Sequence, residues 1–131
     1  MSGTNDPGLR DAEDREAAET PRIRELNDAL RTARGAIGVL LARGQLMITR
    51  GVANLGNDFV QRALQNVREF NDFTEDNDPY GEHDFGSFAL DGEQVYWKID
   101  YYDNDLRNGS PNPADAALTK RVLTILLSEE Y

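Results

Sequence analysis

The residues of this sequence that are best suited to chemistry lie in its second half, around its single histidine. His83 begins a run with strand-like composition, and Lys98 and Asp100 lie in a second such run after the Asp-Gly pair at 91–92. A two-residue turn at Asp-Gly would join the two runs as an antiparallel hairpin. In that register His83 faces Asp100, so an imidazole and a carboxylate would share one face of the sheet.

This pair predicts two kinds of site. An imidazole with carboxylates from adjacent strands would form a divalent-metal or general-base centre, in which Lys98 stabilises an anionic transition state. The candidate catalytic residues are His83, Asp100 and Lys98, and the candidate metal ligands are Glu82, His83, Asp84, Asp100 and Asp103. The alternative is structural: a charge-assisted hydrogen bond holds His83 across the hairpin. We favour the structural alternative and predict no cofactor, because no second histidine accompanies His83.

Other catalytic and ligand-binding patterns are incomplete. Ser87 lies four residues from His83, about 13 Å along a strand, so this imidazole cannot activate its hydroxyl. The loop over 76–81 departs from a calcium-binding loop, since Tyr80 replaces one ligand and Ser87 stands where a glutamate belongs. No glycine-rich phosphate loop is present.

The charge of the chain points to a basic partner. Its 131 residues include 24 acidic and 14 basic side chains, and the net charge is −10 at pH 7. Residues 69–105 hold twelve of the acids against one base, Lys98. This segment repels phosphate, so we expect no direct nucleic-acid binding and instead a protein with a basic surface. The candidate partner-binding residues are Glu75, Asp76, Asp78, Glu82, Asp103 and Asp105.

Residues 21–68 carry eight arginines and three acids. We interpret these arginines as paired with the acidic half or solvated, the alternative being a basic face. They are Arg22, Arg24, Arg31, Arg34, Arg43, Arg50, Arg62 and Arg68.

Several protein classes are excluded by simple features. The longest apolar run, 36–42, is far shorter than the roughly 20 residues that cross a bilayer. Without cysteine there is no disulfide and no thiolate nucleophile. The first residues lack the basic and apolar segments of a secretory signal, so a cytoplasmic location is expected.

Periodicity and turn residues predict an α+β domain. Thr20-Pro21 and Asn112-Pro113 are N-cap signatures, and Asp78, Pro79 and Gly81 predict a tight turn. The predicted elements are a flexible acidic tail over 1–19, a helix over 21–33, a strand over 45–52, a helix from Asn57 to Phe70, a hairpin of 83–90 and 93–102, and a helix after Pro113 with an apolar stripe at Leu118, Val122, Ile125 and Leu126. Residues 36–41 form a further strand or extend the first helix. The expected fold of residues 20–131 is a single domain with a small, mainly antiparallel sheet of three or four strands, covered on one face by two or three helices.

Five strings in the sequence resemble a known family. They are LNDALR at 26–31, TRGV at 49–52, NDPYGEHDFG at 77–86, WKIDYYD at 97–103 and RVLTILLSEEY at 121–131. On these strings the chain resembles a proteobacterial family, domain of unknown function 3768, over residues 22–131. The resemblance implies no activity, cofactor or catalytic residue. It does imply a setting on plasmids and integrating elements, where small acidic proteins that block host proteins are common.

The leading functional hypothesis is a non-enzymatic acidic interaction protein of a bacterial mobile element. It would bind, and modulate or inhibit, a basic partner that is itself a nucleic-acid-binding or defence protein. The alternative is a metal-dependent hydrolase or nuclease centred on His83 and Asp100. A small regulatory domain that stacks a ligand on Tyr96 and Tyr102 ranks third.

Overall fold

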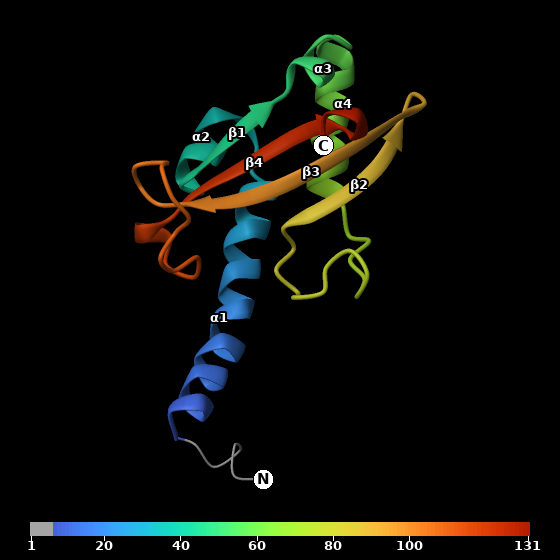
Figure 1. Cartoon of the computed structure of the whole chain (residues 1–131). Helices are drawn as coiled ribbons and strands as arrows, with labels where there is room; N and C mark the ends of the chain where they lie inside the picture. The colour runs from blue at the N-terminus through green and yellow to red at the C-terminus, as the bar shows by residue number, and fades with distance from the viewer. Residues whose placement is uncertain (1–6) are drawn as a thin grey trace.

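The chain folds as helices packed on a four-stranded mixed sheet (Figure 1). This computed structural model describes residues 7–131, with side chains described from residue 19 onward. The elements are α1 (Pro7–Arg31), α2 (Gly35–Leu41), β1 (Gly44–Ile48), α3 (Arg50–Ala53), α4 (Asn57–Glu69), β2 (Phe85–Leu90), β3 (Glu93–Tyr102), the 3-10 helix η2 (Ala116–Leu118), β4 (Lys120–Leu127) and the 3-10 helix η3 (Ser128–Glu130). The strand order is β1-β4-β3-β2, and only β1 and β4 are parallel. The predicted α+β fold with a mainly antiparallel sheet is confirmed.

The core lies between one face of the sheet and the helices α1 and α4 (Figure 1). Helix α4 matches the predicted element closely, and its N-cap residue is Gly56. The buried apolar residues of the core are Leu30 of α1, Val52 of α3, Phe59, Ala63 and Val67 of α4, Val95, Trp97 and Ile99 of β3, and Leu123, Ile125 and Leu127 of β4. Both long helices thus cover β3 and β4, the two central strands.

Strands β2 and β3 form the predicted hairpin in the predicted register, with Phe88 opposite Val95 and Phe85 opposite Lys98. The turn residues Asp91 and Gly92 have φ angles of 52° and 79°. Two positive φ angles are typical of a type I′ turn, whose twist matches that of the flanking strands. The local Asp-Gly signal therefore sets the register of the whole hairpin.

Alternation along β3 separates a buried face from an open one. Trp97 and Ile99 face the helices and are buried, as predicted for Trp97. Lys98 and Asp100 lie on the opposite face, where Lys98 Nζ is 2.8 Å from Asp100 Oδ2 and both side chains are more than a third exposed. These two side chains therefore form an exposed ion pair on the face that α1 and α4 leave open.

The helix predicted after Pro113 is wrong, because most of that segment is the central strand β4. The apolar residues of this segment do recur at helical spacing, but adjacent positions are apolar as well. Both faces of β4 carry buried side chains, including Val122, Leu123, Ile125 and Leu126. A near-continuous run rich in apolar and β-branched residues is the pattern of a central strand whose side chains are buried on both of its faces. Asn112 instead accepts the backbone N–H of Asp115 in a turn.

The first third of the chain also differs from the prediction. Helix α1 begins at Pro7, so it includes much of the predicted tail, and residues 1–6 of that tail lie outside the described residues. The flexibility predicted for 1–19 stays a prediction. Residues 36–41 are neither a strand nor part of the first helix, because they belong to the separate helix α2. Its first residue, Gly35, has a φ of 70°, which changes the direction of the chain after α1. No helix within 7–131 is long and apolar enough to span a membrane.

The C-terminal residues fasten the turn after β1 to the sheet. Glu130 Oε1 accepts a hydrogen bond from Thr49 Oγ1 at 2.6 Å, and Glu130 Oε2 accepts one from the Gly51 N–H at 3.0 Å. These bonds to Thr49 and to the backbone hold the pKa of Glu130 below its usual range. One carboxylate thus joins η3 to the start of α3, directly after β1.

Candidate functional site

His83 does not face Asp100, because the β2–β3 ladder begins only after the histidine. The last ladder bond runs from the Ile99 N–H to the carbonyl of Asp84, at 2.9 Å. His83 itself has a φ of 56°, in the left-handed region, so the strand alternation does not extend to its side chain. The predicted pairing of His83 with Asp100 is therefore wrong.

The imidazole of His83 lies instead on the helix side of the sheet, between two carboxylates. Its Nδ1 is 3.0 Å and 3.1 Å from the two carboxylate oxygens of Asp28 on α1. Its Nε2 is 3.7 Å from Asp78 Oδ2, and Asp78 Oδ1 also accepts the backbone N–H of His83. The ring stacks on Phe73 with centroids 3.7 Å apart and an interplanar angle of 4°. His83 is thereby held on three sides and fastens the loop after α4 to α1.

Arg31 is the second anchor of this cluster. It is buried, with 7% of its surface exposed. It donates to the carbonyls of Val67 and Phe70 at 2.9 and 2.8 Å, and to Asp28 at 2.8 Å. A guanidinium on the last carbonyls of a helix satisfies acceptors that have no partner within the helix. Arg31 therefore terminates α4 and at the same time orients the carboxylate that holds His83.

Asn27, one helical turn before Arg31, organises a second buried polar group. Its Nδ2 donates to the Tyr101 hydroxyl at 2.7 Å and to the carbonyl of Glu82 at 3.0 Å, and its Oδ1 accepts from Arg121 Nε at 2.9 Å. The Tyr101 hydroxyl donates in turn to Glu82 Oε1 at 2.8 Å. Burial raises the pKa of Tyr101, and it lowers the pKa of Arg121. This network joins α1, the 81–84 segment, β3 and β4.

The candidate ligands are thus directed to different partners. Glu82 is held by Tyr101, Asp100 by Lys98, and Asp103 accepts the backbone N–H of Arg107 at 3.0 Å. Within the described part of the chain, no three His, Asp or Glu side chains lie close enough together to hold one metal ion. The arrangement is suited to fixing the loop over 70–84 on the sheet, and it does not form the five-residue centre that the sequence suggested.

Asp84, one of the five candidate metal ligands, has a raised pKa. Burial raises its pKa to about 6, and the nearby carboxylates of Glu82, Asp78 and Asp100 add to the effect. An ionised Asp84 therefore costs folding energy above that pH. A raised carboxyl pKa is also a feature of many functional sites, although structural acidic clusters produce it equally well.

The Asp84→Asn variant is expected to be more stable than the wild type at neutral pH. Below about pH 4 the carboxyl group is protonated in both the folded and the unfolded chain, so its ionisation costs nothing there. The penalty appears as the pH rises from about 4 to 6, and above that D84N should gain about 1–2 kcal/mol, an amount that allows for partial exposure. Urea unfolding at pH 4 and pH 7.5 measures this difference.

Asp91→Asn serves as a control of opposite sign, since a hydrogen bond from Arg62 lowers the pKa of Asp91. That variant should lose stability above pH 4. A D84N gain of equal size at pH 4 and pH 7.5 would contradict the role of ionisation.

The predicted partner-binding acids divide into two groups. Glu75, Asp76 and Asp105 are exposed, and Asp103 is partly buried. The Asp78 side chain is only 6% exposed and contacts His83, and Glu82 is held by Tyr101. Asp78 and Glu82 are thus engaged in contacts within the fold. The acids that remain available to a partner are Glu75, Asp76, Asp103 and Asp105.

The sequence interpretation missed the residues of α1 that build the network, namely Asn27, Asp28 and Arg31. Asn27 and Arg31 lie four residues apart, on the same helix face as the buried Ile23 and Leu30. Two polar residues on the buried stripe of a helix indicate a buried hydrogen-bond network, because such groups need partners. The four-residue spacing of Asn27 and Arg31 on this stripe is therefore a feature of the sequence that indicates the network.

Comparison with known proteins identifies a family and no activity. Residues 48–130 match the family described as protein of unknown function (DUF3768), a range that contains β2, β3 and β4 and lies after α1 and α2. No curated protein and no solved structure gives a significant match. The matched range covers well over half of the chain, including the Glu82–Tyr101–Arg121 side of the network. The chain therefore belongs to the DUF3768 family.

Proposed function

We propose that this protein is a non-enzymatic binding protein of a bacterial mobile element. It would use its acidic loop, residues 72–84, to bind and to modulate or inhibit a basic host protein of the nucleic-acid-binding or defence class. One observation carries the proposal: Glu75 and Asp76 are exposed in a turn of this loop, and neither has a hydrogen bond or ion pair within residues 19–131.

The backbone around these two acids is fixed by local hydrogen bonds. The Thr74 N–H donates to Asn77 Oδ1 at 2.8 Å, and Asn77 Nδ2 donates to the carbonyl of Asp72 at 2.7 Å. The Asp78 N–H donates to the carbonyl of Thr74 at 2.8 Å, and His83 fastens the far end of the loop to α1. A loop ordered before binding loses less entropy in the complex, and its charge accelerates encounter with a basic surface.

Charge reversal tests the proposal. The wild type and the Glu75→Lys/Asp76→Lys variant are immobilised and exposed to host lysate at low and high salt. The wild type should retain a basic protein whose binding weakens as salt is added, and the double variant should bind that purified protein at least about tenfold more weakly. Affinity is then measured by calorimetry with the purified partner.

Glu93→Lys/Glu129→Lys is the matched control, because it changes the net charge by the same amount outside the acidic loop. Both of its positions lack an ion pair within residues 19–131. If the two double variants lose affinity equally, binding depends on net charge alone and the loop is not the site. If no retained protein responds to salt, the proposal fails.

The metal-dependent hydrolase or nuclease gains no comparable support. Its two central residues lie on different sides of the sheet, with His83 toward α1 and Asp100 paired to Lys98. We therefore propose a single function.

A further inference from the structure

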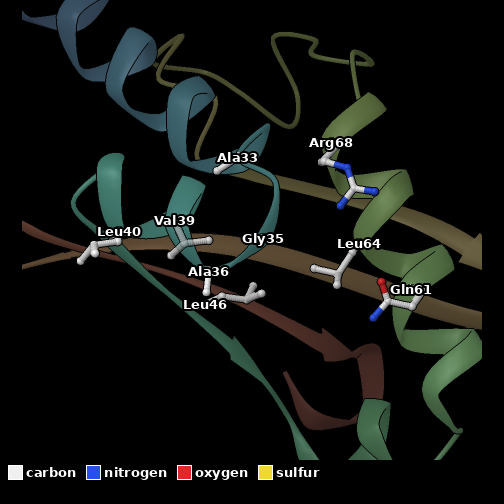
Figure 2. Close-up of a pocket in the computed structure, with 10 residues that line it drawn as sticks. Ala33, Gly35, Ala36, Val39, Leu40, Leu46, Gln61, Leu64 and Arg68 are labelled. Carbon is white, nitrogen blue, oxygen red and sulfur yellow. The ribbon is translucent and has the colours of Figure 1, made fainter.

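A cavity of about 590 Å³ lies between α2 and α4, and no residue of the acidic loop lines it (Figure 2). Val39 and Leu40 of α2 line one side, Leu64 of α4 lines the other, and Leu46 of β1 lies along the base. A narrow continuation shares Val39, Leu46 and Leu64 and reaches the core at Leu30. Sites for small molecules have volumes of roughly 300–1,000 Å³ and mostly apolar walls. This cavity fits both criteria.

The polar groups of the cavity are cationic or neutral. Arg68 of α4 and Gln61 line it, and no acidic residue does. Figure 2 shows the guanidinium of Arg68 beside the apolar walls, and its Nε is buried without a hydrogen-bond partner among the described residues. Residues 32–57, which supply α2 and β1, contain three arginines and no acid, although the whole chain has a net charge of −10. Charge complementarity therefore favours an anion.

Helix α2 also needs apolar contacts. None of the α2 side chains is buried. Ile37, Leu40 and Leu41 are 74%, 74% and 78% exposed. An isolated helix of seven residues is not stable in water, and packing of an apolar face normally supplies the missing free energy. A molecule in the cavity would supply such contacts to Val39 and Leu40.

Two other occupants fit less well. A second copy of the chain would bring together two 32–57 segments, each with three arginines and no acid, and like charges repel. Helix α1 projects away from the sheet toward its N-terminal end at Pro7, so it does not cover the cavity (Figure 1). The shape and charge of the cavity are satisfied by a small molecule with an apolar chain and a negative head group.

We propose that this cavity binds a carboxylate with an unbranched apolar chain, the chemical class of medium-chain fatty acids. The chain lies along Val39, Leu46 and Leu64, and the carboxylate accepts hydrogen bonds from the Arg68 guanidinium, whose planar donors match a carboxylate. The site does not involve the acidic loop, so it stands or falls independently of the proposed function.

The experiment titrates the full chain with sodium octanoate and, separately, with neutral 1-octanol, and follows backbone amide NMR shifts and hydrogen exchange. Octanoate should give saturable shifts in α2, in Leu46 and in the Leu64–Arg68 turn, with slower exchange of the α2 amides. It should bind at least about tenfold more tightly than 1-octanol. Arg68→Gln should abolish this preference, and Leu40→Ser should weaken both ligands.

Two variants outside the cavity serve as controls. Arg62→Gln removes a cation from the same helix, but Arg62 pairs with Asp58 and Asp91. Leu55→Ser removes an exposed leucine that does not line the cavity. Neither should change octanoate affinity. Equal binding of octanoate to wild type and R68Q, equal binding of octanoate and octanol to wild type, or shifts confined to other surfaces would each overturn the proposal.

Discussion

Replacing Arg31 by alanine is expected to lower the free energy of unfolding by about 3–5 kcal/mol, a large share of the 5–15 kcal/mol typical of a domain. The substitution removes the donors to the Val67 and Phe70 carbonyls and leaves Asp28 without its cation. It also removes the guanidinium that lies 5.3 Å and 5.6 Å from the ring centroids of Phe73 and Trp97. Urea unfolding followed by circular dichroism measures the loss.

Arg24→Ala is the matched control on the same helix. Among the side chains of residues 19–131, Arg24 makes a single hydrogen bond, to the carbonyl of Gly81 at 3.2 Å, so its loss should cost no more than about 1 kcal/mol. Arg31→Met keeps the apolar stem and removes only the donors. R31M should show most of the decrease in the free energy of unfolding expected for R31A. An R31M variant as stable as wild type would show that packing, rather than the buried polar bonds, matters at this position.

The second large effect is expected at Gly86, which lies opposite Trp97 in the β2–β3 ladder. A Cβ atom at this position would lie 2.7 Å from Trp97 Cε2 and 2.8 Å from Phe70 Cζ, distances that carbon atoms do not adopt without movement. Both rings are in the core, where neighbours cannot easily move. Gly86→Ala should therefore cost about 3 kcal/mol through overpacking.

Gly109→Ala provides the comparison, because the nearest atom to its added Cβ is 4.0 Å away. It should change the free energy of unfolding by no more than about 0.5 kcal/mol. The near-ultraviolet circular dichroism of the single tryptophan reports directly on the G86A site. Unchanged stability and an unchanged Trp97 signal in G86A would contradict the packing described here.

The parts of the fold that sequence predicted well are those determined by nearby residues. The Asp91-Gly92 pair defines a turn type and, through it, the register and facing of β2 and β3. Helix α4 carries a complete apolar stripe of its own. In both cases the information lies within about ten residues of the element.

The parts that sequence predicted wrongly depend on distant contacts. Residues 120–127 are compatible with a helix when considered alone, and they become a strand because β1 and β3 pair with both of their edges. Likewise, the position of His83 follows from its positive φ and from Asp28 on α1, 55 residues earlier. Local patterns do not contain these partners, and the pairing of His83 with Asp100 suggested by strand alternation is therefore not the one that the fold makes.

The parallel pairing of β1 with β4 has a consequence for synthesis on the ribosome. Residue 44 leaves the exit tunnel long before its ladder partner, residue 121, has been translated. During that interval β1 has no strand to pair with, and Thr49 has no Glu130 to bind. The four-stranded sheet therefore closes only after β4 has been translated, and until then the edge of β1 is open to non-native contacts.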